Sequence, residues 1–242
     1  MINRNSIVIC CLVLRFASQA QNAIDDQIHG WVAYQGNHKL NDKFDLHTEY
    51  QWRRADGFAN WQQSLARVGL DYRLNPNLTF SGGYGWINTF PYGSQPIAAQ
   101  TNEHRLWQQV NLKAQYGSIQ IQHRYRLEQR WIDTLFRQRI RYRAQCIIPL
   151  QQTYLEQGKG LFLNVNDEVF LGFGKGIGKN ILDQNRFISA VGYKFDSNFN
   201  IQLGYLNQFV VKTNGVQMER NHTLWTSVVY NLDFFYLSRK KT

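Results

Sequence analysis

The chain has 242 residues, a formal net charge of +10 and a sequence pI of about 9.6. A charge of this size points to an anionic partner, such as nucleic acid, phosphorylated lipid or acidic sugar. However, only 18% of the residues are charged, while 14% are aromatic and the mean hydropathy is -0.45. Soluble nucleic-acid-binding proteins seldom combine these values. A membrane β-barrel does combine them, because half of its strand residues face water.

The first 20 residues are predicted to be a signal peptide that is removed on export. Arg4 gives a positive start, residues 7–16 form an apolar segment, and residues 18–20 supply small side chains for cleavage. The alternative is an ordinary buried N-terminal strand. Removal of residues 1–20 takes away Arg4 and Arg15, so the net charge falls from +10 to +8. We therefore expect one mature domain, residues 21–242, in the outer membrane of a bacterial cell.

Cysteine content and hydropathy exclude several other classes. Two of the three cysteines lie in the predicted signal peptide, and only Cys146 remains in the mature chain. A single cysteine forms neither an intrachain disulfide nor a thiolate metal cluster. No later stretch of about 18 apolar residues exists, so no transmembrane helix is expected. We predict no metal site and no cofactor.

Alternation of apolar and polar residues dominates the mature chain and predicts two-faced β-strands. In residues 44–52, for example, Tyr50 and Trp52 share one face, whereas Glu49 and Gln51 share the other. Segments of this kind are long enough to cross a bilayer at a tilt. About eleven are present: 30–36, 44–52, 66–74, 77–86, 104–116, 118–129, 136–147, 161–173, 187–195, 199–209 and 223–232.

Two kinds of connection alternate between these segments. Short turns rich in Asn, Asp, Gly and Pro are predicted at 40–43, 74–77, 116–118 and 196–199. Longer polar connections are predicted at 54–60, 91–101, 129–135, 175–184 and 211–221. Short turns at one rim and longer loops at the other are typical of outer-membrane barrels. The sequence thus predicts an all-β fold, a transmembrane antiparallel up-and-down β-barrel of about 10–12 strands. Since such barrels have an even strand number, we expect 10 or 12.

Arginine recurs at every second position in much of the segment 124–143. In a strand this spacing gathers the guanidinium groups on one wall, whereas a helix with 3.6 residues per turn would spread them around its circumference. We therefore predict a lumen wall with these ligand-binding residues: Arg105, Arg124, Arg126, Arg130, Arg137, Arg139, Arg141, Arg143, Arg186, Glu128 and Glu168. Glu49, Asp71 and Glu103 offset the positive charge further, but only in part. Trp107 and Trp225 are also predicted to face inward, where they would fill the lumen or stack on a sugar.

A series of motifs in a fixed order resembles a known family. The motifs are EHRLWQQ (103–109), HRYRLEQRW (123–131), FRQRIRYR (136–143), NDEVFLGFGK (166–175), DQNRF (183–187) and LGYLNQ (203–208). They are similar to landmarks of an uncharacterised family of bacterial outer-membrane β-barrel proteins, classed as domain of unknown function 2490. The resemblance covers about residues 28–235 and implies an outer-membrane barrel, without a reaction or ligand. Such barrels tend to end on an aromatic residue, here Phe234 or Phe235, but this chain continues through residues 236–242.

These features predict a small anion-preferring channel or a ligand-binding barrel with an arginine-rich lumen. A ring of guanidinium groups attracts phosphates, acidic oligosaccharides or lipopolysaccharide head groups. The alternative is a salt-bridged barrel without transport, because side chains fill barrels of about eight strands and wide pores need roughly 16. The expected partners are outer-membrane lipid and lipopolysaccharide, the barrel-insertion machinery and anionic small solutes.

Two further classes were weighed against this interpretation. An outer-membrane lipid hydrolase or deacylase needs a nucleophile and a base in hydrogen-bond reach, usually Ser and His. The predicted faces place His47 and His104 on opposite sides and His123 toward lipid. We therefore assign no catalytic residue and expect no enzyme. A soluble nucleic-acid binder is suggested by the arginines of 137–143. The signal peptide and the apolar face argue against it, and no nucleic acid is expected as a partner.

Overall fold

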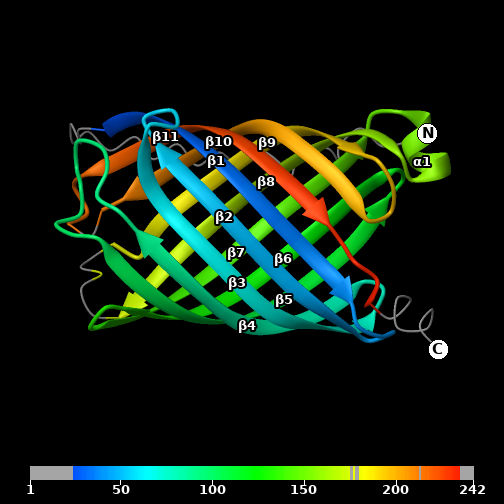
Figure 1. The fold of residues 1–242 in the computed structure, drawn as a ribbon, viewed down its shortest axis with the longest axis horizontal. Coiled ribbons are helices and arrows are strands. Elements are labelled where there is room, and N and C mark those ends of the chain that lie inside the picture. The colour runs from blue at the N-terminus through cyan, green and yellow to red at the C-terminus, as the bar shows by residue number, and fades with distance from the viewer. Residues whose placement is uncertain (1–23, 175–176, 178–179, 213, 235–242) are drawn as a thin grey trace, which may run out of the picture.

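The eleven alternating segments form one closed barrel (Figure 1). The computed structural model describes residues 24–174, 177, 180–212 and 214–234. The predicted signal peptide, residues 1–20, and the tail, residues 236–242, lie outside the described residues. The all-β barrel fold of about 10–12 strands is confirmed, and each predicted segment coincides with one strand.

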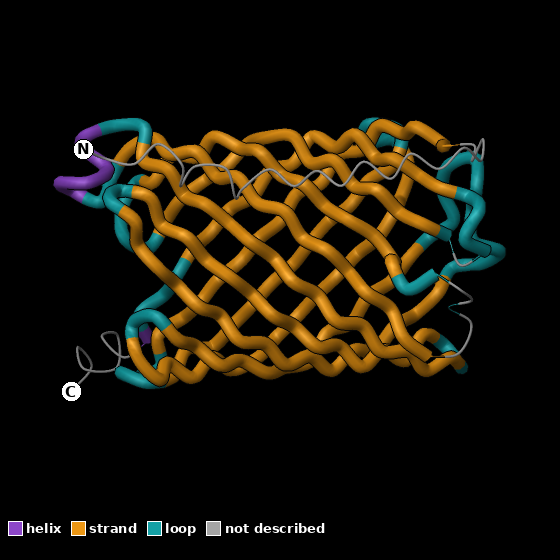
Figure 2. Tube along the Cα trace, turned by 180° about the vertical axis from the view of Figure 1, so that it is seen from behind, coloured by secondary structure: helices purple, strands orange, loops and turns teal. Residues whose placement is uncertain are grey.

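Strands that follow one another in the chain lie side by side around the whole circumference, as Figure 2 shows from behind. This up-and-down order needs only a short connection at each end of a strand. The strands are β1 (Ile24–Lys39), β2 (Phe44–Ala55), β3 (Asn60–Asn75), β4 (Leu78–Thr89), β5 (Thr101–Tyr116), β6 (Ile119–Ile132), β7 (Leu135–Pro149), β8 (Gly160–Gly174), β9 (Leu182–Lys194), β10 (Phe199–Val211) and β11 (Met218–Tyr230), with helix α1 (Gln152–Gln157) between β7 and β8.

The barrel closes between β1 and β11, which run parallel, whereas the other neighbouring strands are antiparallel. The expectation of 10 or 12 strands is therefore wrong, because it assumed antiparallel closure. An up-and-down chain with an odd number of strands brings its first and last strands to the seam in the same direction. They can then pair only in parallel. On the outer wall, Arg220 braces this seam with hydrogen bonds of 2.5 and 2.9 Å to its register partner Asp26.

The two rims of the barrel differ in their connections. One rim carries the turns at 40–43, 76–77, 117–118 and 195–198 and the connection 150–159 with α1; we call it the short-turn rim. The other carries the β4–β5 loop, residues 90–100, and is called the long-loop rim. The prediction of a longer loop at 129–135 is wrong: Asp133 and Thr134 alone join β6 to β7. Asp133 takes a φ of 49°, a left-handed conformation that aspartate tolerates in turns.

Side chains along each strand alternate between the outer wall and the lumen. Tyr125, Leu127 and Trp131 of β6 are 49%, 39% and 41% exposed, whereas Arg126 and Glu128 between them are 2% and 0% exposed. The arginine-rich segment is therefore two strands with inward guanidinium groups, not a helix. No helix in the described residues is long and apolar enough to cross a membrane.

Candidate functional site

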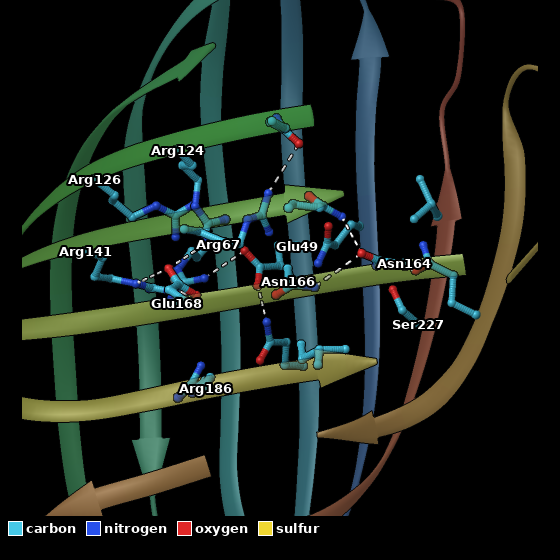
Figure 3. A pocket seen from close by; sticks show the side chains of 18 of the residues that line it. Glu49, Arg67, Arg124, Arg126, Arg141, Asn164, Asn166, Glu168, Arg186 and Ser227 are labelled. Atoms are coloured by element: carbon cyan, nitrogen blue, oxygen red, sulfur yellow. Dashed lines mark hydrogen bonds and ion pairs between the residues drawn. The ribbon is translucent and has the colours of Figure 1, made fainter. Parts of the chain in front are cut away.

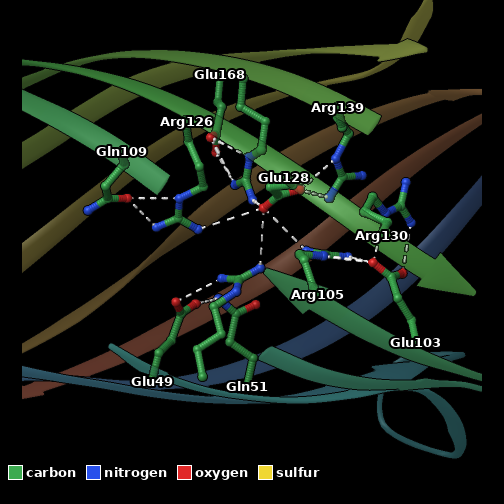
Figure 4. A network of polar contacts seen from close by, with 12 residues as sticks. Glu49, Gln51, Glu103, Arg105, Gln109, Arg126, Glu128, Arg130, Arg139 and Glu168 are labelled. Carbon is green, nitrogen blue, oxygen red and sulfur yellow. Dashed lines mark hydrogen bonds and ion pairs between the residues drawn. The ribbon is translucent and has the colours of Figure 1, made fainter. Parts of the chain in front are cut away.

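Glu128 of β6 lies at the centre of an ion-paired cluster in the middle of the lumen (Figure 4). Its carboxylate accepts hydrogen bonds of 2.8 Å from Arg139 Nε and 2.7 Å from Arg141 Nη1. Arg105 Nη1 lies 3.3 Å from Glu128 Oε1, and one guanidinium nitrogen of Arg67 and one of Arg126 each lie 3.9 Å from the same oxygen. We call Glu128 and its partners the central belt: Arg67, Arg105, Arg126, Arg139, Arg141.

Further carboxylates extend the belt toward the short-turn rim. Glu168 of β8 accepts hydrogen bonds from Arg141 Nε and Nη2, both at 2.9 Å, and from Arg124 Nη2 at 2.6 Å. Glu49 of β2 accepts one of 2.8 Å from Arg67 Nη1. Such charge-assisted hydrogen bonds are about twice as strong as neutral ones, so they fix the arginine side chains in place.

A similar set of contacts extends the belt toward the long-loop rim. Glu103 of β5 accepts hydrogen bonds of 2.7 Å from Arg105 Nε and of 2.7 and 2.8 Å from Arg130 Nε and Nη2. Asp183, at the start of β9, accepts one of 2.8 Å from Arg139 Nη1. Arg105, Arg130 and Arg139 thus each reach at least one carboxylate on this side of the belt.

Trp107 supports the belt from the wall formed by β3, β4 and β5. Its indole is fully buried, and the guanidinium carbon of Arg126 lies 4.9 Å from the ring centroid. The ring packs against the backbone of Gly69 and Gly83, where an added Cβ would lie 2.5 and 2.7 Å from ring atom Cζ2. Only glycine at these positions leaves room for the indole. The inward orientation predicted for Trp107 is confirmed.

A polar cavity of about 270 Å³ lies between the central belt and the short-turn rim (Figure 3). We call it the lumen cavity. Its wall carries seven arginines and three carboxylates, an excess of four positive charges when only these residues are counted. These residues are Arg53, Arg67, Arg124, Arg126, Arg141, Arg143, Arg186, Glu49, Asp71 and Glu168. A second cavity, of about 160 Å³, lies on the opposite side of the belt, where Gln63, Thr89 and Tyr92 contribute to its wall.

Three arginines of the lumen cavity have no carboxylate within ion-pair distance among the described residues: Arg53, Arg143 and Arg186. Arg53 donates to Gln63 Oε1 at 2.6 Å, and Arg143 Nη2 lies 3.5 Å from Gln122 Oε1. Arg186 stacks on Phe170, with its guanidinium carbon 4.8 Å from the ring centroid. The buried Nε atoms of Arg143 and Arg186 donate no hydrogen bond to any described group. The lumen cavity therefore carries three guanidinium groups whose charge no carboxylate of the described residues compensates at ion-pair distance.

An apolar patch lies on the side of the lumen cavity formed by β9, β10, β11 and β1, next to polar residues such as Arg186, Gln202 and Ser227. Trp31, Ala190, Leu206 and Trp225 pack together there, with Ile188 against them. Trp31 and Trp225 are register partners across the parallel seam, which places the two indoles next to each other on the inner wall. We call these five residues the apolar wall. The inward orientation predicted for Trp225 is confirmed.

The β4–β5 loop reaches into the lumen at the long-loop rim. Tyr92 donates a hydrogen bond of 2.8 Å to Glu219 Oε1, and Lys212 Nζ donates one of 2.6 Å to Glu219 Oε2. Asn221 Nδ2 donates to Glu219 Oε1, and Asn221 Oδ1 accepts a hydrogen bond of 2.8 Å from His29 Nε2. Burial raises the pKa of Tyr92, and the neighbouring carboxylate of Glu219 raises it further. The phenol therefore stays protonated and holds the loop.

The structure brings most of the predicted lumen residues together. Arg105, Arg126, Arg139, Arg141 and Glu128 belong to the central belt. The lumen cavity is lined by Arg124, Arg126, Arg141, Arg143, Arg186 and Glu168. Arg130 pairs with Glu103 on the long-loop side, and Arg137 lies beside it as its register partner, away from the lumen cavity. Their role in binding a ligand stays a prediction.

Two lumen arginines were missing from the predicted set. Arg67 lies on the polar face of its strand, and its spacing from Asp71 already indicated an inward side chain. Arg53 follows Trp52, where the predicted strand ended, but β2 continues to Ala55. Extending the alternation of Glu49 and Gln51 by one step would have placed Arg53 on the inner wall. The amide side chains that line the cavity carry no charge pattern and gave no comparable signal.

The hydroxyl–histidine pair of Thr48 and His38 does not have the arrangement of a nucleophile and its base. The backbone N–H of Leu232 donates to His38 Nδ1 at 3.0 Å, so the neutral ring carries its proton on Nε2. That nitrogen lies 2.8 Å from Thr48 Oγ1 and donates to it, and therefore cannot take the hydroxyl proton. In the described part of the chain, no group of three or more His, Cys, Asp or Glu side chains could hold a metal ion.

Comparison with known proteins gives one family. The model of a family described as "Protein of unknown function (DUF2490)" matches residues 28–219, from β1 to the start of β11. No curated protein and no solved structure matches the chain. The match spans the central belt and most of the lumen cavity.

Proposed function

This chain belongs to the DUF2490 family, and we propose that it is an outer-membrane β-barrel whose lumen binds a small anionic solute. The observation that carries the proposal is the charge of the lumen cavity, where seven arginines face three carboxylates. Guanidinium groups attract anions, and their planar N–H pairs match the oxygens of phosphate and carboxylate. Arg143 and Arg186 line this cavity without a carboxylate at ion-pair distance among the described residues, so their charge supports binding of such an anion.

Three features support a place in the outer membrane. The outer wall exposes aliphatic and aromatic side chains on every side, including Leu70, Trp86, Tyr125, Phe187 and Leu224. The strands have 12–16 residues, which exceeds the roughly 9–11 residues that a tilted transmembrane strand needs. The N-terminal segment also has the composition of a signal peptide.

The central belt favours a binding site over an open anion channel. Its side chains are only 0–7% exposed, and the two cavities lie on either side of it. A solute that crossed would have to break several charge-assisted hydrogen bonds, each stronger in a low-dielectric interior than in water. The ligand therefore enters and leaves the lumen cavity at the short-turn rim, which faces the periplasm in an outer-membrane barrel.

Titration of inorganic phosphate into the refolded protein tests the anion site by calorimetry. We expect binding that weakens as salt rises, since bulk ions screen the cavity charge. The double variant Arg143→Gln/Arg186→Gln should bind about tenfold more weakly, because charged hydrogen bonds are lost. The control Lys113→Gln removes a positive charge from an exposed side chain outside the cavity and should leave the affinity unchanged. Absence of phosphate binding, or an equal effect of Lys113→Gln, would contradict the proposal.

Cell fractionation tests the location independently of the ligand. The protein should sediment with the outer membrane and need detergent for extraction, because its outer wall is apolar. A cytosolic pool that stays soluble without detergent would overturn the membrane assignment, whatever the phosphate titration gives.

A further inference from the structure

We propose that the ligand of the lumen cavity is an anionic monosaccharide, such as a sugar phosphate or a uronic acid. Its ring would pack on Trp225 and its anionic group would lie among Arg124, Arg143 and Arg186. The inference rests on the proposed anion site and adds the chemical class of the ligand. The inference is based on the lining of the cavity, which combines guanidinium groups, an indole ring, and amide and hydroxyl side chains.

The two sides of the lumen cavity are unlike. One side, on β6, β7 and β8, presents the charged groups of Arg124, Arg141, Arg143 and Glu168. The other side carries the apolar wall, with Arg186 of β9 beside it and 5.2 Å from the Trp31 ring centroid. In this wall Trp225 remains 8% exposed, whereas Trp31 is 3% exposed and donates its indole N–H to Gln62 Oε1 at 2.6 Å. A ligand that contacts both sides needs an anionic group and an apolar face. Figure 3 shows Arg124 and Arg186 entering the cavity from different strands.

Amide and hydroxyl side chains fill the space between these two sides. Asn164 Nδ2 donates to Gln202 Oε1 at 2.7 Å, and Gln145 Nε2 donates to Asn164 Oδ1 at 2.9 Å. Asn166 and Ser227 lie beside them on the cavity wall. An amide both donates and accepts, which matches the hydroxyl groups of a sugar. An aliphatic ligand in place of the sugar would offer no hydrogen bond to the remaining donors and acceptors of these amides and would displace water from them, which costs free energy.

The size of the cavity limits the ligand to one ring. Its volume of about 270 Å³ lies just below the range of roughly 300–1,000 Å³ that holds drug-sized ligands. The face of a sugar ring carries C–H groups that pack on an indole, while its edge carries the hydroxyls. A single hexose ring with one phosphate or carboxylate therefore satisfies the apolar wall, the amides and the arginines at the same time.

Calorimetric titrations with four probes test the inference: glucose 6-phosphate, inorganic phosphate, methyl glucoside and octanoate. Glucose 6-phosphate should bind about tenfold more tightly than phosphate, because it adds contacts with Trp225 and the amides. Trp225→Leu should remove this advantage and leave the phosphate affinity unchanged. The control Trp86→Leu changes an indole that is 44% exposed on the outer wall and should alter neither value.

The outcomes separate the sugar inference from the anion site. Equal affinities for glucose 6-phosphate and phosphate, or tighter binding of octanoate, would overturn the sugar inference while leaving the anion site in place. Failure of phosphate and glucose 6-phosphate to bind at all would overturn both. If Trp225→Leu does not refold, Gln145→Leu serves instead, since Gln145 is half-buried on the cavity wall. Gln145→Leu should lower the affinity for glucose 6-phosphate and leave the affinity for inorganic phosphate unchanged. An equal effect on the two affinities would contradict the inference.

Discussion

The central belt and the lumen cavity are built from the same residue type but differ in how its charge is compensated. In the belt, five arginines surround the buried carboxylate of Glu128, and all of them except Arg126 also reach Glu49, Glu103, Glu168 or Asp183. In the cavity, Arg143 and Arg186 have no such partner in the described structure. The proposed function assigns the compensated arginines of the belt to closing the lumen and the uncompensated charge of the cavity to binding an anion.

Loss of the Glu128 carboxylate should have the largest effect on this comparison. Glu128→Gln leaves five buried guanidinium groups around a neutral side chain, and breaking a buried pair in this way costs about 3–5 kcal/mol. The free energy of unfolding of the refolded barrel in urea measures it. The control is Asp42→Asn at the short-turn rim, whose carboxylate is 82% exposed and contributes little through Lys39. Equal stabilities of the two variants would contradict the structural role of the belt.

Overpacking beneath Trp107 should have the next largest effect. Gly69→Ala puts a methyl group 2.5 Å from the indole, which must shift beneath Arg126, and such overpacking costs about 1–3 kcal/mol. Near-UV circular dichroism and urea unfolding measure the displacement and its cost. Gly82→Ala is the matched control in the neighbouring strand, because its nearest contact would be the backbone oxygen of Trp107 at 3.6 Å. A similar loss of stability in both variants would show that indole packing is not the cause.

Removal of an uncompensated arginine should change stability in the opposite direction from removal of Glu128. Arg143→Gln lowers the excess positive charge of the cavity and should raise the free energy of unfolding by up to about 1 kcal/mol, since close like charges repel. The gain should shrink in high salt. Urea unfolding at low and high salt measures it. Destabilisation comparable to that of Glu128→Gln would mean that Arg143 is part of the belt rather than of a binding surface.

The smallest effect is expected at the long-loop rim. Tyr92→Phe removes the hydrogen bond to Glu219 and should cost about 1 kcal/mol. Because the folded-state pKa of Tyr92 is raised, its contribution is fully present below about pH 10 and is lost as the pH rises through the raised value. Unfolding curves between neutral and alkaline pH measure it. Tyr116→Phe, on a side chain that is 79% exposed, should behave as wild type. If Tyr92→Phe loses as much unfolding free energy at alkaline pH as the wild-type protein does, Tyr92 is not the titrating group.

Alternation predicted the barrel, its eleven strand segments and the wall on which Arg126, Arg139 and Arg141 lie, because side-chain direction in a strand is set by local geometry. It did not predict the parallel seam. The direction of the closing pair depends on the parity of the whole strand count, and no single segment contains that information. The inward position of Arg53 was missed for a different reason, since strand ends are poorly marked in sequence.

The pairing of charges could not be predicted from the sequence. Arg124 meets Glu168, 44 positions away, and Arg105 meets Glu128 on the next strand. Which arginines find a carboxylate depends on how the registers of several strands add up around the barrel. The same holds for the apolar wall, where Trp31 and Trp225 become neighbours only through closure of the seam.

Recording ionic current through the refolded protein in a planar bilayer tests most directly whether the belt closes the lumen. The wild-type protein should show no discrete openings at neutral pH, under conditions in which the same preparation binds phosphate in the calorimeter. Discrete openings of the wild type, with either anion or cation preference, would contradict a closed belt and a binding site that is reached from one rim only.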